Sequence, residues 1–142
     1  MAKRKKLAKT HYETLAAFRY ALRKFMHFSE QAAQDSGITP QHHQALLAIK
    51  GFPGRDHVTV GELAERLQRR PHSVVGLVDR LVAEKLVTRR TTTGDQRQVW
   101  IHLSKHGETM LEQLSSVHHA ELERIGPELT LLLEQLSAVQ DR

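Results

Sequence analysis

Paired arginines and short polar side chains stand together in the stretch "RLQRRPHSVVGLVDRL", residues 66–81. Arg69 and Arg70 come just before a proline, and His72 and Ser73 come just after it. Guanidinium groups bind phosphate oxygens, whereas hydroxyl and imidazole groups can exchange hydrogen bonds with the edges of bases. The residue types therefore favour the binding of a polyanion. The serine beside the histidine is only adjacent in sequence and does not make a catalytic geometry.

The same stretch is predicted to form a helix that begins near Pro71 and buries one face. Its apolar residues follow the spacing of a core-facing stripe: Val74, Leu77, Val78, Leu81 and Val82. On the other side, Gly76 would let a base edge approach, and Val75 could contact a thymine methyl group. Alternatively, Gly76 serves helix packing and the arginines are merely solvated. The candidate contact residues of the helix and the turn before it are Arg69, Arg70, His72, Ser73, Val75, Gly76 and Arg80.

A hairpin is predicted next, because "LVTRRTT" and "RQVWIHL" are β-like segments that flank the turn sequence "TGDQ". An arginine at the tip of such a hairpin suits a minor groove, where a narrow groove concentrates negative potential. Asp95 cannot favour DNA by its charge, so we expect it to pair with an arginine of the hairpin and fix its direction. It can equally be a turn residue only. The candidate contact residues of the hairpin are Arg89, Arg90, Asp95, Arg97 and Gln98.

Helices are predicted on both sides of this region. An amphipathic helix is predicted over about residues 11–34, with Gly37 as its C-cap. Thr39 is the predicted N-cap of the helix that follows. Thr59 and Glu62 have the spacing of a capping box for a short helix that precedes the quoted stretch. The order of elements predicts a mainly α, winged-helix type of α+β fold, in which a helix-turn-helix and a hairpin lie between long terminal helices.

The C-terminal part of the chain is predicted to be helical from Ser104 onward, with that serine as its N-cap. Leucines recur there at spacings of three and four residues. The dipeptide Gly126–Pro127 interrupts the pattern, so two helices are expected, the second of which begins at Pro127. So small a middle portion cannot bury the apolar stripes of both terminal regions, which favours a second copy of the chain as their partner.

Positive charge is concentrated in the middle of the chain. Residues 66–105 hold nine basic side chains against three acidic ones, whereas residues 106–142 hold two basic side chains against seven acidic ones. The first nine residues add five basic side chains and no acidic one. Such a block is the electrostatic pattern of a surface that binds a polyanion. A charged face that is only solvated would give the same distribution of charge in the sequence.

Composition bounds the class of protein. The 142 residues are 39% hydrophobic and 26% charged, as in a single compact globular domain. No apolar run has the length of a membrane span, the N-terminus lacks the pattern of a signal peptide, and there is no cysteine, which together fit a cytoplasmic protein. There is no phosphate-binding loop, dinucleotide fingerprint or nucleophile–base set, so we expect neither an enzyme nor a cofactor.

The segment "VTVGELAERLQRRPHSVVGLVDRLVAEKLVTRRTTTGDQRQVWIHLSKHG" resembles the winged-helix core of MarR-family transcriptional regulators. The family's late pattern, D-x-R in the wing followed by an apolar strand and L-[TS]-x-x-G, is matched by Asp95, Arg97, Leu103, Ser104 and Gly107. "TPQHHQALLAIKG" is similar to the family's preceding helix. The resemblance covers roughly residues 10–140 and is strongest over residues 58–107. It departs from the family where Gln96 and Gln98 flank Arg97, because the usual wing carries more arginine there.

The resemblance implies a homodimer that binds a pseudo-palindromic operator in double-stranded DNA, usually represses nearby genes, and is often released by a small ligand, frequently phenolic or aromatic. It also implies that Arg97 enters the minor groove, with Asp95 as its acidic partner. The expected regions are a basic arm (1–9), a winged helix-turn-helix (37–103), and dimerisation helices (10–36 and 104–142). Candidate residues for a ligand site, which core packing explains equally well, are Phe18, Phe25, Phe28, His43 and Leu46.

Ten histidines raise the question of a metal. The adjacent pairs at 42–43 and 118–119 point about 100° apart on a helix and are poorly placed to share an ion. His102 and His106 lie on either side of a strand end. No metal-binding residue is therefore predicted, but a zinc-responsive regulator stays open as an alternative. So does a dimeric protein-interaction module that does not bind DNA.

Overall fold

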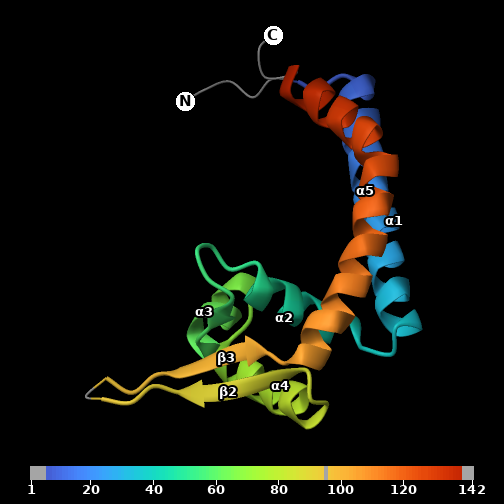
Figure 1. Cartoon of the computed structure of the whole chain (residues 1–142). Helices are drawn as coiled ribbons and strands as arrows, with labels where there is room; N and C mark the ends of the chain where they lie inside the picture. The colour runs from blue at the N-terminus through green and yellow to red at the C-terminus, as the bar shows by residue number, and fades with distance from the viewer. Residues whose placement is uncertain (1–5, 95, 139–142) are drawn as a thin grey trace, which may run out of the picture. The chain divides into compact units, whose positions relative to one another are not determined.

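The computed structural model describes residues 6–94 and 96–138, and the chain divides into two units. The helical unit comprises Met1–Glu30 and Val117–Arg142, and the winged-helix unit comprises Gln31–Ser116. The elements are α1 (Lys9–Asp35), α2 (Pro40–Lys50), β1 (His57–Val58), α3 (Val60–Leu67), α4 (Pro71–Ala83), β2 (Val87–Thr91), β3 (Val99–Leu103) and α5 (Lys105–Ala138) (Figure 1).

Side-chain caps begin the helices as predicted. The Thr39 hydroxyl accepts a hydrogen bond of 3.0 Å from the His42 N–H at the start of α2. At the start of α3, the Thr59 hydroxyl accepts from the Glu62 N–H at 3.2 Å, and the Glu62 carboxylate accepts from the Thr59 N–H at 2.9 Å. This reciprocal pair is the predicted capping box, and it satisfies N–H groups that the helix itself cannot pair.

A tight turn joins α3 to α4. Gln68 adopts the left-handed region with φ 54°, and the next residue, Arg69, donates its N–H to the carbonyl of Ala64 at 2.9 Å. Helix α4 then begins at Pro71, which has no N–H to leave unpaired in the first turn. The result is a helix-turn-helix whose second helix starts directly after the two arginines at 69 and 70.

Three antiparallel strands form the sheet, in the order β1–β3–β2. Val87 pairs with Leu103 at one end of the hairpin and Thr91 pairs with Val99 at the other. The sequence had predicted only the two strands of the hairpin. Strand β1 is two residues long and pairs His57 with His102, so it adds a short edge at the base of the hairpin. Figure 1 shows the hairpin reaching out beyond α3 and α4.

The winged-helix unit has its own hydrophobic core. Helices α2, α3 and α4 and the sheet each contribute to it, and its fully buried large side chains are Leu46, Ile49, Val58, Leu63, Val74, Leu77, Val78, Leu81, Leu86, Val87, Ile101 and Leu114. The predicted core stripe of α4 is confirmed, with Val82 partly buried at its edge. Because this face is fixed to the core, the opposite face of α4 is the one left exposed.

Close packing explains the glycine of the L-[TS]-x-x-G pattern. The Ser104 hydroxyl caps α5 as predicted, accepting from the Gly107 N–H at 3.0 Å while donating to the Lys85 carbonyl at 2.6 Å. A Cβ on Gly107 would lie 2.1 Å from the Leu86 carbonyl oxygen, a distance no side chain can occupy. The glycine therefore lets the first turn of α5 rest on the chain that leads into β2.

The predicted break at Gly126–Pro127 is wrong, because α5 runs without interruption from Lys105 to Ala138 with Pro127 inside it. A proline disfavours helical geometry at the preceding residue mainly through a clash with that residue's N–H and Cβ. Gly126 has no Cβ, which removes part of this clash. The apolar spacing on both sides of the dipeptide stays in one helical phase, so packing favours continuation. Within residues 6–94 and 96–138, no helix combines the length and hydropathy that a membrane span needs.

Candidate nucleic-acid interface

One side of α4 is lined by exposed, short or polar side chains. His72, Ser73 and Val75 are exposed, and Gly76 is partly exposed. Arg80 is also exposed, one turn further along. All five predicted contact residues of α4 thus lie away from the core. This surface, His72, Ser73, Val75, Gly76 and Arg80, is called the α4 face below.

The N-terminus of α4 adds the positive end of the helix dipole to the α4 face. Arg70 is the N-cap residue, and within the described part of the chain its side chain makes no capping hydrogen bond. The Ser73 and Val74 N–H groups both turn back to the Arg70 carbonyl, at 3.0 and 3.3 Å. These two N–H groups are paired within the first turn, but Ser73 is exposed at the positive end of the helix dipole, which favours a phosphate or another acceptor there.

The two arginines of the turn differ in their surroundings. Both are exposed. The amide oxygen of Gln41 on α2, in its hydrogen-bonding orientation, accepts from Nη1 and Nη2 of Arg69, the latter at 3.1 Å. Arg69 is thereby held against α2, whereas Arg70 projects from the turn. The sequence pattern could not have found Gln41, because nothing in the order of residues brings α2 next to this turn.

Gly76 does not serve close packing between helices. A Cβ built on it would meet, among the described residues within 4 Å, only Nη1 of Arg80, at an ordinary contact distance of 3.7 Å. The packing explanation considered for this glycine is therefore wrong. An exposed glycine in the middle of a helix costs stability relative to alanine, by roughly 0.5–1 kcal/mol. Its place on the α4 face is consistent with a surface that must come close to something else.

Hydrogen bonds between residues 92 and 98 extend the hairpin beyond β2 and β3. The Thr92 N–H donates to the Gln98 carbonyl at 2.9 Å, and the Gln98 N–H donates to the Thr92 hydroxyl at 2.9 Å. Arg97 and Gln98 are both exposed, and Arg97 is the next residue toward the tip. Asp95, the expected orienting carboxylate, lies outside the described residues.

A different acidic residue pairs with an arginine of the hairpin. Arg89 on β2 donates from Nη2 to Oδ1 of Asp79, which is an exposed residue of α4. The pair connects the hairpin to α4, and it occupies part of the guanidinium that the sequence assigned to DNA contact. Arg90, the neighbouring candidate, is exposed and pairs across the sheet with Trp100. Sequence reasoning missed Asp79 as a partner because it treated α4 and the hairpin separately.

Aromatic rings and cations cover the solvent face of the sheet near β1. The Arg55 guanidinium lies 4.4 Å from the ring centroid of Phe52 and 4.9 Å from that of Trp100, and it also pairs with the Glu62 carboxylate. Trp100 in turn meets the His57 ring edge-on, with centroids 4.8 Å apart. Such cation–π contacts add to the stability of exposed surfaces by about 0.5–1 kcal/mol each. They anchor the loop before β1 to the base of the hairpin.

The residues proposed for a small-ligand site fall in different units. In the helical unit, Phe18 is half-buried, and the rings of Phe25 and Phe28 meet the His118 ring edge-on, at centroid distances of 6.0 and 5.6 Å. In the winged-helix unit, His43 and Leu46 are buried in the core. A site that uses both groups stays a prediction.

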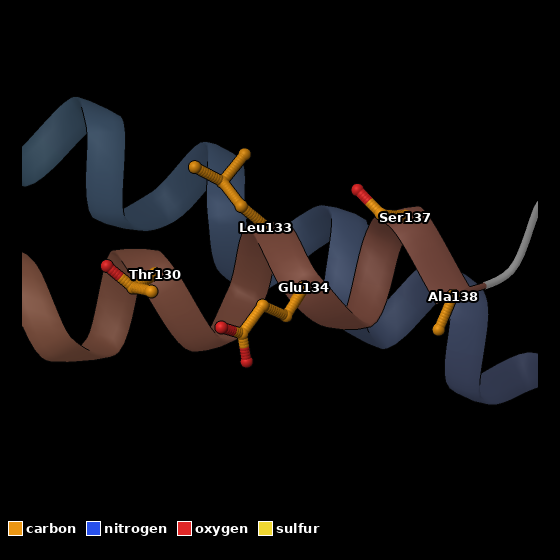
Figure 2. Close-up of a pocket in the computed structure, with 5 residues that line it drawn as sticks. All are labelled: Thr130, Leu133, Glu134, Ser137 and Ala138. Atoms are coloured by element: carbon orange, nitrogen blue, oxygen red, sulfur yellow. The ribbon is translucent and has the colours of Figure 1, made fainter.

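A shallow hollow of about 480 Å³ lies on the last turns of α5. Figure 2 shows the side chains that line it, all from this one helix: Thr130, Leu133, Glu134, Ser137 and Ala138. They recur at helical spacing along the surface and bring together no pair of groups suited to catalysis. Leu133 is half exposed and is the one large apolar side chain among these lining residues, the others being small or polar.

Residues 36–98 match the family model described as the MarR family. The chain is 28% identical over 104 residues to the HTH-type transcriptional repressor YetL of Bacillus subtilis (strain 168), a match that spans 72% of this chain and 61% of that repressor. The match with this chain thus spans less than two thirds of the length of YetL.

Solved structures share the fold. AbsC, a MarR family transcriptional regulator from Streptomyces coelicolor, aligns with a TM-score of 0.73 and 21% identity over 97% of each chain. MepR from Staphylococcus aureus, in a mutant form bound to an oligodeoxyribonucleotide, aligns with a TM-score of 0.66 and 22% identity over 92% of this chain and 99% of that chain. The family match covers the helix-turn-helix and the hairpin as far as residue 98, so the chain resembles the MarR family over this region and shares the fold of its solved members.

Proposed function

We propose that the chain is a transcriptional regulator that binds double-stranded DNA in a sequence-specific way, as a homodimer, and represses the genes it controls. The observation that carries this proposal is the α4 face, an exposed surface of short polar side chains on a helix that is anchored to the core along its other side. Repression is proposed by analogy with YetL, which is a transcriptional repressor. Action on genomic DNA would require a cytoplasmic location.

Helix α4 has the properties of a recognition helix. A major groove about 12 Å wide admits an α-helix whose contacting side chains are short. His72 and Ser73 would hydrogen-bond to base edges, Val75 would contact a thymine methyl group, and Gly76 would let the helix approach closely. Arg70 and Arg80 would reach phosphates at the sides of the groove. The oligodeoxyribonucleotide bound by MepR makes duplex DNA a reasonable partner for a chain of the same fold.

The hairpin would supply the second contact. Arg97 is exposed toward its tip, where a guanidinium can enter a minor groove and respond to groove width. The salt bridge between Arg89 and Asp79 would fix the position of the hairpin relative to α4, so that both can contact the same duplex. Gln98, beside Arg97, would add a hydrogen bond in place of the arginine usual in the family.

A dimer would align two such surfaces. Large apolar side chains of the helical unit are exposed, among them Tyr20, Met26, Leu122, Leu131 and Leu133. A second copy would cover them through regions 10–36 and 104–142. Two α4 helices related by a two-fold axis would address half-sites about 34 Å apart, which is one helical turn of DNA, and would therefore select a pseudo-palindromic operator.

Release by a small, aromatic or phenolic effector completes the proposal. Its support is the similarity of residues 36–98 to the MarR family and the presence of half-buried aromatic rings in the helical unit. The candidate residues are Phe18, Phe25, Phe28, His43 and Leu46. Binding, rather than catalysis, would then be the whole activity of the chain.

Salt dependence tests the DNA-binding proposal directly. Duplex fragments would first be selected from genomic DNA, and their affinity would be measured at several salt concentrations. Affinity should fall on a log–log plot with a slope of about −0.9 for each phosphate neutralised. Absent or salt-insensitive binding to every duplex would contradict the proposal and favour a protein-interaction module.

Substitutions divide the contacts into general and specific ones. Arg97→Ala should weaken binding to operator and random duplex alike and reduce the salt slope by about one. Ser73→Ala should instead reduce discrimination between operator and random duplex, because a base contact carries sequence information. The matched control is Arg23→Ala, which removes an exposed arginine of the helical unit and should leave affinity and slope unchanged. Equal effects of Arg97→Ala and Arg23→Ala would contradict insertion of the hairpin tip.

A further inference from the structure

Three potential metal ligands meet at the base of the hairpin, on the face of the sheet that turns away from the core. His57 on β1 and His102 on β3 are directly paired across the two strands. Their neighbours Val58 and Ile101 are fully buried, so strand alternation turns both histidines to the outer face. Asp56 precedes β1 and brings a carboxylate to the same place.

The three side chains already converge. One donor atom from each lies within 4.8 Å of the others. His57 donates from Nδ1 to Oδ1 of Asp56 at 3.3 Å. The two imidazole rings stack with centroids 4.7 Å apart and planes 22° from parallel. Asp56 is exposed, whereas His57 and His102 are half-buried, so an ion can enter from solvent while the strands hold the rings.

We propose that Asp56, His57 and His102 form a binding site for a divalent transition-metal ion of the zinc class. Two imidazole nitrogens and one carboxylate oxygen are the donor set of open zinc sites, in which water completes a tetrahedron. Hard cations such as Mg²⁺ and Ca²⁺ prefer sites made of oxygen alone. The site is distinct from the α4 face, and the proposal does not depend on DNA binding.

Binding requires only a small contraction. With bonds of about 2.1 Å, the ligand atoms of a tetrahedral zinc site lie about 3.4 Å apart. Rotation of the two stacked imidazole rings about their side-chain bonds would bring their nitrogens to this distance, and the paired strands fix the backbone from which they rotate. The Asp56 carboxylate would exchange its hydrogen bond to His57 for the metal.

The surroundings favour a neutral ligand at His102. Burial, followed by the nearby charges of Arg90 and His57, lowers the pKa of His102 below its usual value. A metal must displace a proton from a protonated imidazole, so a neutral one binds more readily. The positive charge of Arg90 also opposes the ion itself, but its side chain is exposed and long enough to turn toward solvent.

An ion at this site would link two parts of the winged-helix unit. It would bridge β1 to β3, and β3 is the strand that continues into the hairpin. Residue 59, directly after β1, is the N-cap of α3, so the bridge would also fix the start of the helix-turn-helix. Metal would therefore stiffen the hairpin relative to the helices. Sequence analysis predicted no metal site because it compared only histidines close together in the chain.

The test is metal binding by the full chain without DNA. Co²⁺ would be titrated into the protein and followed by visible absorption, and Zn²⁺ affinity would be obtained by competition. We expect one bound ion that is lost in His57→Gln and in His102→Gln, with a fall in affinity beyond the roughly 10–100-fold that changes outside the ligand set produce. Asp56→Asn should weaken binding less, because an amide oxygen remains available.

The matched control is His106→Gln, which removes an exposed histidine close in sequence but outside the cluster. It should bind Co²⁺ and Zn²⁺ as the wild type does. Circular dichroism and metal-free melting curves would establish that each variant folds. The proposal is overturned if the wild type does not bind, if the His57→Gln/His102→Gln double variant keeps its affinity, or if His106→Gln loses as much.

Discussion

The winged-helix unit and the helical unit differ in whether their large apolar side chains are buried or exposed. Among the described residues, almost all of the buried apolar core belongs to the winged-helix unit, and only Ala21 and Leu132 belong to the helical unit. Conversely, the large apolar side chains that are exposed lie in the helical unit, with three exceptions, Leu47, Val75 and Val99. One unit therefore buries most of its large apolar side chains, and the other leaves many of them exposed.

This difference separates two sources of stability. Burying a leucine fully contributes about 1.5–3 kcal/mol relative to leaving it in water. The winged-helix unit gains this free energy within one chain, so its contribution is independent of protein concentration. In the homodimer proposed above, the helical unit would gain it on association, so its contribution would depend on concentration. Substitutions of leucine in the two units should consequently give different kinds of result.

The largest effect is expected in the core of the winged-helix unit. Leu77 lies on the buried side of α4 and is 0% exposed. Leu77→Ala should lower the free energy of unfolding by about 2–5 kcal/mol, because it removes buried methyl groups and leaves a cavity. Urea unfolding at several protein concentrations would measure the loss, which should not change with concentration.

The control for this prediction is Val75→Ala on the same helix, where the side chain is exposed. It should change the free energy of unfolding by less than about 0.5 kcal/mol. Comparable losses for the two substitutions would mean that the division of α4 into a buried stripe and the α4 face is wrong.

A smaller effect, of a different kind, is expected in the helical unit. Leu131 is 54% exposed on α5. Leu131→Ser should shift the monomer–dimer equilibrium toward monomer by about 1–3 kcal/mol, because the dimer would lose a buried apolar side chain. Sedimentation velocity over a range of concentrations would follow the shift, and the secondary structure of the monomer should be retained.

Leu47→Ser provides the matched control, since this leucine is exposed to a similar extent, 47%, but lies in the winged-helix unit. It should leave the association constant unchanged. If the wild-type chain is monomeric at micromolar concentration, the proposed role of the helical unit in association is contradicted.

Sequence patterns predicted best where the determining interactions are local. Helical spacing identified the buried stripe of α4, and the N-cap threonines identified where α2 and α3 begin, because both signals depend on residues within one or two turns. Strand β1 was missed because two residues carry no periodicity, and its pairing with β3 depends on a distant segment. The continuity of α5 was missed because Gly126 was taken as a break, although it lowers the steric cost of the proline after it.

The predictions for the candidate site show the same difference between local interactions and contacts made by tertiary packing. The exposed residues of α4 could be predicted as the complement of its buried stripe. Partners from other elements could not: Asp79 for Arg89, Gln41 for Arg69, and His57 for His102 are all brought together by tertiary packing. Periodicity specifies which side of an element is free, but it does not specify which free side chains meet.

The smallest expected effect on stability concerns the capping box at the start of α3. Its glutamate, Glu62, also pairs with Arg55 in the loop before β1. Burial alone would raise the pKa of Glu62, but hydrogen bonds from the Thr59 N–H and Arg55 outweigh it and hold the pKa below its usual value of 4.5. A depressed pKa in the folded state means stabilisation that is complete above pH 4.5 and is lost as the pH falls through the lower, folded-state value.

Glu62→Gln should therefore lower the free energy of unfolding by about 1 kcal/mol near pH 7, since the amide can still accept from the Thr59 N–H but no longer attracts Arg55. The gap between variant and wild type should narrow below pH 4.5 and close once the wild-type carboxylate is protonated. Glu65→Gln, at an exposed position of the same helix, is the control and should show no such pH dependence. A gap that stayed constant down to acid pH would mean that the Glu62 charge does not stabilise the box. It would also leave the shape of the side chain as the only source of its effect.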